Sequence, residues 1–204
     1  MNEKELLLSR ARELKERAAD SSMITSTNFL SPEERSAVSV IEIENNKYVF
    51  TFYYGGFPDA ERTAAVFVPT FYEISDIDAF MKENTDENPF SLIECTKDKF
   101  TSMSHRDYLG SLMALGIKRE MIGDIVVTEN GCHFFSVKSI ANYICDNLKR
   151  TGRGSVNCKI IAIDSLPQSE DNSKTVFSSV ASLRLDCVVA AAFSMSRTSA
   201  VEAI

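Results

Sequence analysis

The sequence predicts an α+β protein, and three observations lead to that prediction. Segments with the apolar period of amphipathic helices alternate with short runs rich in valine, isoleucine and phenylalanine. Clusters of glycine, proline and asparagine separate many of these runs, as is typical between strands. A polar stretch at residues 164–174 then precedes a closing part that has helical periodicity only. We therefore expect mixed α and β domains followed by a short helical unit.

Residues 1–88 are predicted to form a small α/β domain. Glu3 to Ala19 alternates leucine with charged residues, which indicates an amphipathic helix with one apolar stripe. A second helix should begin at Pro32, because Ser31 suits the N-cap position and Glu34 stands three residues further on. Two runs typical of strands follow, "KYVFTFYY" and "RTAAVFVP", and "GGFPDAE" between them indicates a loop.

Residues 89–165 carry a more diagnostic order of elements. "FSLIECT" predicts a strand, "SHRDYLGSLMALG" a helix, and "GDIVVTENGCHFFSV" two strands around the hairpin signal Asn130-Gly131. "KSIANYICDNLKR" then predicts a helix and "VNCKIIAI" a last strand. This β-α-β-β-α-β order is that of ferredoxin-like and RRM-like domains. In the first helix, Ser104 and Asp107 fit a capping box, and Gly116 suits the position after the last turn.

Composition and charge narrow the class of protein. The chain has 204 residues and a net charge of -7, with 44% hydrophobic and 25% charged residues, which is ordinary for a globular protein. The acidity argues against a surface coated in basic charge, so any affinity for nucleic acid depends on local clusters of lysine and arginine. No apolar run approaches the roughly 18 residues of a membrane span, and the charged N-terminus does not resemble a signal peptide. We expect a cytoplasmic protein without a membrane partner.

The cysteines indicate neither a zinc site nor a disulfide framework. They are odd in number, widely spaced and never arranged as CxxC, and only His105 and His133 could join them as ligands. Buried free thiols are therefore the favoured interpretation for Cys95, Cys132, Cys145, Cys158 and Cys187.

The sequence offers little that supports catalysis. It contains no GxSxG elbow, no HExxH motif and no glycine-rich cofactor loop. His133 stands within a strand beside Phe134, which favours a half-buried structural role over that of an acid, a base or a ligand. We predict a protein that is not an enzyme, with no cofactor, no metal and no small-molecule substrate.

Basic residues gather at the ends of the two helices predicted in residues 89–165. In "TGRGSV", glycines on both sides of an arginine would let backbone amides approach a phosphate closely. The other interpretation is that these residues are solvent-exposed charges that satisfy the helix termini. Both interpretations stay open. The candidate RNA-binding residues of this domain are His105, Arg106, Lys118, Arg119, Lys149, Arg150 and Arg153.

The closing segment, "SLRLDCVVAAAFSMSRTSAVEAI", predicts two short helices joined by a polar turn. Arg184 and Arg197 stand at the two helix starts, and Ser194 or Ser196 suits the cap of the second helix. A helix start with exposed amides and a neighbouring arginine is suited to bind phosphate. An ordinary helical hairpin that packs on the rest of the protein is the alternative.

Two resemblances to known proteins emerge from these motifs. "LRLDCVVAAAFSMSRTSAVEAI" resembles the first half of the ribosomal-protein-S-four-type RNA-binding domain, on the positions of Arg184, Asp186, Ser196 and Arg197. "HRDYLGSLMALGIKREMIGDI", "YYGGFPDAER" and "TGRGSV" resemble the YlmH family of bacterial RNA-binding proteins. That family has an N-terminal domain, an RRM-like central domain and a C-terminal S-four-type domain, whose pattern continues into a sheet. The resemblance implies a linker at 166–174 and an S-four-type unit at 175–204 that is cut short.

What the resemblance implies is non-catalytic binding of rRNA and tRNA on the large ribosomal subunit, in ribosome-associated quality control or another translation-linked role, with a link to cell division. Arg184, Ser196, Arg197 and Thr198 would then contact RNA. One alternative is an RNA-modifying enzyme of the pseudouridine-synthase kind, whose catalytic stretch also contains Arg-Leu-Asp, although Asp186 is better interpreted as a helix-start residue. The other is a protein-interaction scaffold with an exposed apolar surface, whose binding would be insensitive to salt.

Overall fold

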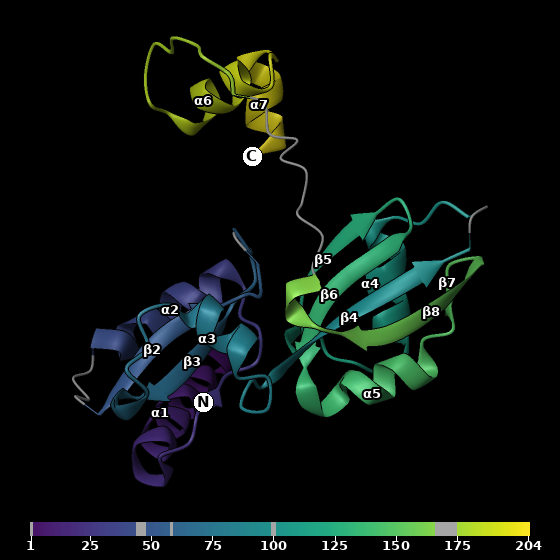
Figure 1. The fold of residues 1–204 in the computed structure, drawn as a ribbon. Coiled ribbons are helices and arrows are strands. Elements are labelled where there is room, and N and C mark those ends of the chain that lie inside the picture. Colours follow the sequence, from purple (N-terminus) through teal and green to yellow (C-terminus); the bar gives the residue numbers. More distant parts are fainter. Residues whose placement is uncertain (1, 44–47, 58, 99–100, 166–174) are drawn as a thin grey trace. The chain divides into compact units, whose positions relative to one another are not determined.

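The computed structural model describes residues 2–43, 48–57, 59–98, 101–165 and 175–204 (Figure 1). The chain divides into two compact units, Met1–Pro167 and Gln168–Ile204. The described residues of the first unit form two antiparallel sheets with helices, and those of the second form two helices. The predicted α+β class is therefore confirmed. Within the described ranges, no helix has both the length and the apolar character that crossing a membrane requires.

The first two helices begin where local capping chemistry places them. Helix α1 (Glu3–Ser21) starts after Asn2, whose side chain accepts a hydrogen bond from the Glu5 backbone N–H at 2.8 Å. Helix α2 (Pro32–Ile43) follows Ser31, whose hydroxyl accepts from the Glu34 N–H at 3.2 Å while the Glu34 carboxylate accepts from the Ser31 N–H at 2.7 Å. The capping box predicted at Ser31 is thus confirmed.

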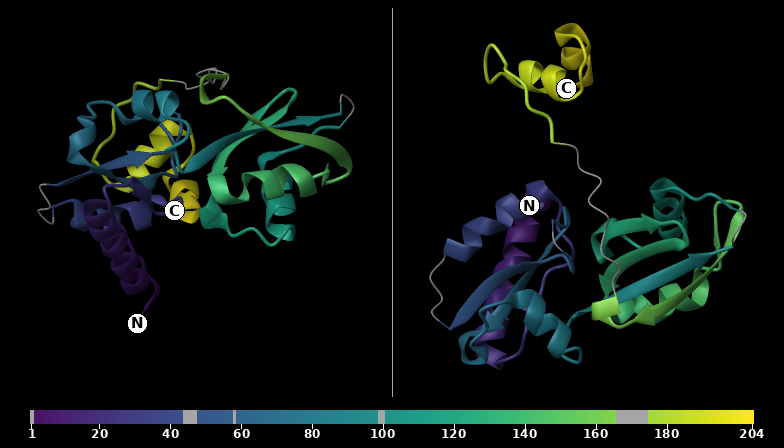
Figure 2. Two further views of the ribbon diagram at one scale, coloured as in Figure 1. Left: turned by 60° about the horizontal axis from the view of Figure 1, so that its bottom comes forward. Right: turned by 45° about the horizontal axis from the view of Figure 1, so that its top comes forward.

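The N-terminal sheet has the order β1-β3-β2, with β1 at Thr25–Ser26, β2 at Val49–Tyr54 and β3 at Ala64–Pro69. Every residue of the central strand β3 is buried, because side chains from both faces of the sheet cover it. Figure 2 shows α1 running along this sheet. Strand β1 and the short helix α3 (Ile77–Glu83) were not predicted, since neither is long enough to display a period.

The following sheet has the order β5-β6-β4-β8-β7, which matches the predicted β-α-β-β-α-β topology with one extra short strand (Figure 1). Helices α4 and α5 cover one face of it. The bounds are β4 Phe90–Lys97, α4 His105–Ala114, β5 Ile122–Thr128, β6 Gly131–Val137, α5 Lys138–Asn147, β7 Arg150–Thr151 and β8 Gly154–Ile161. Single 3₁₀ turns lie at Thr70–Tyr72, Arg119–Met121 and Ile163–Ser165.

The middle strand β4 separates two hydrophobic cores. Ile93 packs with residues of α4 and α5 such as Leu112, whereas its neighbour Leu92 packs with Phe135 and Phe29 on the opposite face. All five side chains are fully buried. This opposite face of the sheet is therefore covered in part by residues that precede β4. These residues belong to the same compact unit as the sheet, and we call residues 2–88 the N-terminal domain for brevity.

Hydrogen bonds also join the N-terminal domain to the start of β5. The Asp124 carboxylate accepts from the backbone N–H groups of Glu61 and Arg62 at 2.6 and 3.2 Å. The Arg62 guanidinium donates to the carbonyl of Phe29 at 2.8 Å, and the Phe29 N–H donates to the carbonyl of Glu120 at 2.7 Å. The motifs "DAER" and "KREMIGDI" therefore meet in space and have an architectural role.

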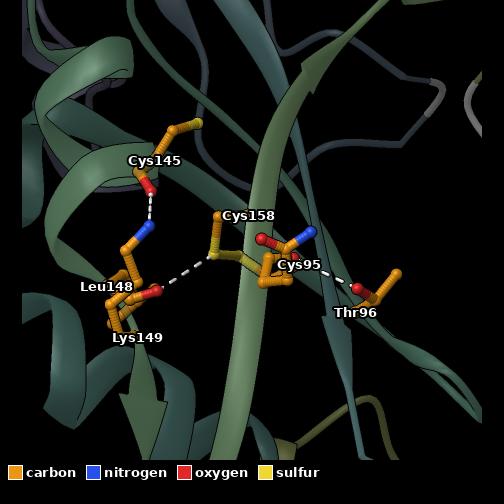
Figure 3. Close-up of a disulfide and its surroundings, with 7 residues drawn as sticks. Cys95, Thr96, Cys145, Leu148, Lys149 and Cys158 are labelled. Carbon is orange, nitrogen blue, oxygen red and sulfur yellow. Dashed lines mark hydrogen bonds between the residues drawn. A yellow bond between two sulfur atoms is a disulfide. The ribbon is translucent and has the colours of Figure 1, made fainter.

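The expectation that the sequence holds no disulfide was wrong for one pair. Cys95 of β4 and Cys158 of β8 form a disulfide, with their Cα atoms 4.2 Å apart (Figure 3). They stand directly opposite each other on neighbouring antiparallel strands, a register that a separation of 63 residues does not reveal. Cys132 and Cys187 are buried free thiols, as expected, and Cys145 is a partly buried one.

The second unit consists of α6 (Leu185–Ala192) and α7 (Arg197–Ala203), which pack on each other. Both helices agree with the prediction for the closing segment. The predicted linker at 166–174 lies outside the described residues.

Gly56 provides a test of the contact between the N-terminal domain and the sheet. Its φ is +92°, and a Cβ there would overlap the ring of the buried Phe135. We expect Gly56→Ala to lower the free energy of unfolding by about 2–4 kcal/mol through overlap and backbone strain. Apart from the backbone of its own helix and its chain neighbours, Gly110 of α4 has no atom within 4 Å of its Cβ position, so Gly110→Ala should be neutral or stabilising by up to ~1 kcal/mol. Urea denaturation measures the free energy of unfolding of both variants. Equal values for Gly56→Ala and Gly110→Ala would contradict the described packing.

Candidate nucleic-acid interface

The sheet of residues 90–161 does not offer aromatic side chains to RNA bases. RRM-like domains stack bases on aromatic residues of the sheet face that the helices leave open. Here Phe135 lies on that face but is fully buried beneath the N-terminal domain, and Phe134 packs into the core under the helices. Phe90 is 2% exposed. The described strands β4, β5, β6 and β8 thus carry no exposed aromatic residue.

Charged side chains occupy the next row of the same face and pair with one another. The Glu94 carboxylate lies 2.8 Å from the Lys159 ammonium and 3.4 Å from His133 Nε2. The hydrogen bond and charge of Lys159, with a smaller contribution from His133, hold the pKa of Glu94 below its ordinary range. His133 is 8% exposed, which agrees with the structural role predicted for it. Because its charges are compensated, this row is poorly suited to bind phosphate.

Exposed basic residues lie together at one end of the same domain, where the start of α4 meets the β7–β8 turn. Gly152 in that turn lies against Asp107 of α4, with 3.7 Å between its Cβ position and the Asp107 carboxylate. Gly154 is so close to Met103 and Thr101 that any side chain there would collide. We call this exposed set the basic end, and it comprises His105, Arg106, Lys149, Arg150 and Arg153.

Two acidic residues, Asp98 and Asp107, accept hydrogen bonds that fix the loops of the basic end. Asp98 accepts from the Ser155 backbone N–H at 3.2 Å and from the Thr101 hydroxyl at 2.7 Å, which joins the turn to the preceding loop. Asp107 accepts from the Ser104 hydroxyl and N–H at 2.7 and 2.8 Å, so the predicted capping pair is present and the pKa of Asp107 is lowered. Because this carboxylate occupies the start of α4, the exposed cations, and not the helix terminus, are the groups available to phosphate.

Lys118 and Arg119 lie beyond the C-terminal end of α4 and do not join the basic end. The Arg119 guanidinium donates to the carbonyls of Ile122 and Gly123 at 2.7 and 2.9 Å, and its burial lowers its pKa. Lys118 is exposed and lines a groove with residues of the N-terminal domain, including Leu7. The structure therefore separates these two residues from the other five predicted in this domain.

In the second unit, one aspartate accepts hydrogen bonds from two arginines. The Arg184 Nε donates to Asp186 Oδ1 at 3.0 Å, while Arg197 donates to Asp186 Oδ2 through Nη2 at 2.6 Å and Nε at 3.1 Å. The Asp186 side chain is 8% exposed, against 71% and 61% for the two arginines. Their hydrogen bonds lower the pKa of Asp186 to about 2, and Asp186 in turn raises the pKa of Arg197. We call Arg184 and Arg197 the arginine pair.

Local sequence explains how the arginine pair forms. Arg184 is the N-cap residue of α6, and Ser196 caps α7 by accepting from the Ser199 N–H at 3.0 Å. Ser194 adopts a φ of +52° in the turn between the helices, where the chain changes direction. Thr198 is exposed near the start of α7. The shared carboxylate was not predicted from the sequence, where the two arginines were assigned to separate helix starts. The aspartate two residues after Arg184 was the available signal.

Comparisons with known proteins agree with this organisation. Residues 85–165 match a family model described as "Putative RNA-binding domain in YlmH". The chain is 31% identical over 176 residues to the "Ribosome-associated protein quality control protein P2" of Bacillus subtilis, an alignment that covers 85% of this chain and 62% of that protein. The chain thus spans less than two thirds of that relative. The structure of the "Cell division protein ylmH from Streptococcus pneumoniae" shares the fold, with a TM-score of 0.57, 19% identity, and coverage of 79% of this chain and 92% of that one.

The depressed pKa of Asp186 predicts a titration that depends on the arginine pair. We expect its carboxyl carbon to titrate near pH 2 by NMR, and Arg197→Ala to raise this midpoint toward the ordinary value of about 3.9. Stability contributed by these contacts is complete above about pH 4, the unfolded pKa, and is lost as the pH falls through the folded pKa. Arg10→Ala, which removes an exposed arginine paired with Glu13, should leave the midpoint unchanged. An unchanged midpoint in Arg197→Ala would show that the contact is absent in solution.

Proposed function

We propose that this chain, which belongs to the YlmH family, is a non-catalytic, cytoplasmic RNA-binding protein that binds rRNA and tRNA on the large ribosomal subunit. The family model that matches residues 85–165 describes an RNA-binding domain, and the Bacillus subtilis relative is named for ribosome-associated quality control. These findings support a role in that process or in another step linked to translation.

The observation that carries the proposal is the shared carboxylate of the arginine pair. Asp186 neutralises one of the two guanidinium charges and so leaves one net positive charge on an exposed surface. Among the described residues, neither Nη group of Arg184 has a hydrogen-bond partner, nor does Nη1 of Arg197. Planar guanidinium groups held in fixed orientation are suited to bidentate contacts with phosphate. We infer that the pair binds the RNA backbone, with Ser196 and Thr198 beside it.

The basic end supplies a second candidate contact. Its five side chains are exposed at the start of α4, after α5, on the short strand β7 and in the β7–β8 turn, and the sheet face of the same domain has its aromatic residues buried. Recognition there would use charge and backbone shape and not base stacking, which predicts little sequence preference and a steep dependence on salt. The net charge of -7 does not oppose this mode, because the cations are clustered.

A protein-interaction scaffold is the second candidate function, and one observation favours it. The second unit exposes large apolar side chains, with Phe177 93%, Leu183 91% and Phe193 71% exposed. Exposed apolar groups of this kind often mark a surface that binds a protein. Binding through them would be insensitive to salt.

Binding of the full chain to purified large ribosomal subunits and to tRNA across a salt series tests the proposal. Arg184→Ala and Arg197→Ala should each weaken binding about fivefold or more, roughly 1 kcal/mol, and reduce the salt slope by about one, because each removes a phosphate contact. Arg10→Ala is the matched control and should bind as the wild type does. A combined Arg106→Ala, Arg150→Ala and Arg153→Ala variant reports on the basic end.

The outcomes separate the candidates. If only the combined variant loses affinity, RNA is bound at the basic end and the role of the arginine pair is wrong. If no variant changes binding and salt has no effect, the scaffold function is supported and RNA binding is contradicted.

A further inference from the structure

Three cysteines form one row across adjacent strands. Cys132 of β6 stands opposite Cys95 of β4, and Cys95 stands opposite Cys158 of β8. All three side chains are buried in the core under α4 and α5, with Cys158 at 6% the most exposed of them. Cys95 thus has a neighbouring cysteine on each side, and only Cys158 is its disulfide partner.

The hydrogen-bond pattern of the sheet explains which partner is used. The Lys97 N–H donates to the Asn130 carbonyl at 2.9 Å, so the alternate residues of β4, including Cys95, direct their N–H groups toward β6. Cys95 and Cys132 are therefore a hydrogen-bonded pair, in which the side chains stand further apart. Cys95 and Cys158 are the non-hydrogen-bonded pair, in which side chains approach most closely, and their Cα atoms are 4.2 Å apart.

The disulfide joins a sheet edge to the sheet centre. Strand β8 pairs with β4 along most of its length, but on its other side only Gly154 and Ser155 pair with β7. The Val156 N–H also donates to the Lys149 carbonyl on that side, at 3.0 Å. Among the described strands, residues 157–161 therefore have a neighbour on the β4 side only. Such edges open more readily than central strands, and a crosslink to β4 limits that opening.

We propose that Cys95 and Cys158 are a reversible thiol–disulfide site that exchanges with low-molecular-weight thiols and disulfides and fastens the edge strand β8 to β4. In the reduced protein, opening of β8 exposes Cys158, whose thiolate attacks one sulfur of a small disulfide and releases one small thiolate. The Cys95 thiolate then attacks the Cys158 sulfur, forms the protein disulfide and releases the second small thiol. Two protein thiols are oxidised while one small disulfide is reduced to two thiols, and excess small thiol reverses both steps.

Cys132 remains a thiol in this scheme. It stands in the wider pair with Cys95, and burial raises the pKa of its thiol, so little of the reactive thiolate is present. This residue provides a matched control, because Cys132→Ser removes a buried cysteine of the same row without removing the crosslink.

Disulfide mapping of the full chain in a graded series of reduced and oxidised glutathione tests the proposal. After alkylation and peptide mass spectrometry, the wild type and Cys132→Ser should both show a Cys95–Cys158 crosslink that forms with oxidised glutathione and disappears with excess reduced glutathione. In the wild type, Cys132 should be alkylated throughout. In Cys158→Ser, Cys95 should be found as a thiol or a glutathione adduct.

Hydrogen exchange of the same oxidised and reduced samples tests the fastening. The amides of residues 157, 159 and 161 face β4 and should exchange at least tenfold more slowly in the oxidised form, and the thermal midpoint should rise by roughly 5 °C or more. Unmodified Cys95 and Cys158 at every glutathione ratio, or a Cys95–Cys132 crosslink in the wild type, would overturn the site. A crosslink that leaves exchange in β8 unchanged would overturn its fastening role. If Cys158→Ser does not fold, the wild type and Cys132→Ser still decide between these results.

Discussion

The antiparallel pairing of β4 with strands on both sides is the constraint on which the rest of the structure depends. Alternate residues of this strand pack into two different hydrophobic cores. Ile93 packs with α4 and α5, and Leu92 packs with the N-terminal domain. A shift of one residue in register would exchange the two sets and leave neither core filled. The same register brings Cys95 opposite Cys158. It also positions strand β8, and Arg153 lies in the turn that precedes β8.

Burial of one sheet face has a direct consequence for function. With Phe135 covered and Glu94 paired to Lys159, the surface that RRM-like domains ordinarily present to RNA offers neither stacking nor uncompensated charge. The cations that we propose as phosphate contacts lie instead at the basic end and in the arginine pair. An acidic protein is compatible with phosphate binding through local groups of positive charge such as these, because affinity depends on where the cations lie and not on the net charge alone.

Features decided by neighbouring residues were predictable from the sequence, and features decided by register or tertiary contact were not. The capping groups at Ser31 and Ser104, the longer helices and the β-α-β-β-α-β order depend on local chemistry and periodicity, and the structure agrees with these predictions. The Cys95–Cys158 disulfide depends on how two distant strands align. The contact of Asp124 with residues 61–62 likewise joins segments about sixty positions apart, and the shared carboxylate of Asp186 depends on how α6 and α7 meet.

Ultraviolet crosslinking of the full chain to ribosomal RNA, followed by mass spectrometry of the crosslinked peptides, tests the central claim most directly. The account predicts crosslinks in peptides that contain residues 184–198 or 149–153, and none in peptides from the sheet face around Glu94 and His133. Crosslinks concentrated on that face would contradict it, because they would show that RNA binds where the structure offers paired charges and buried aromatic residues.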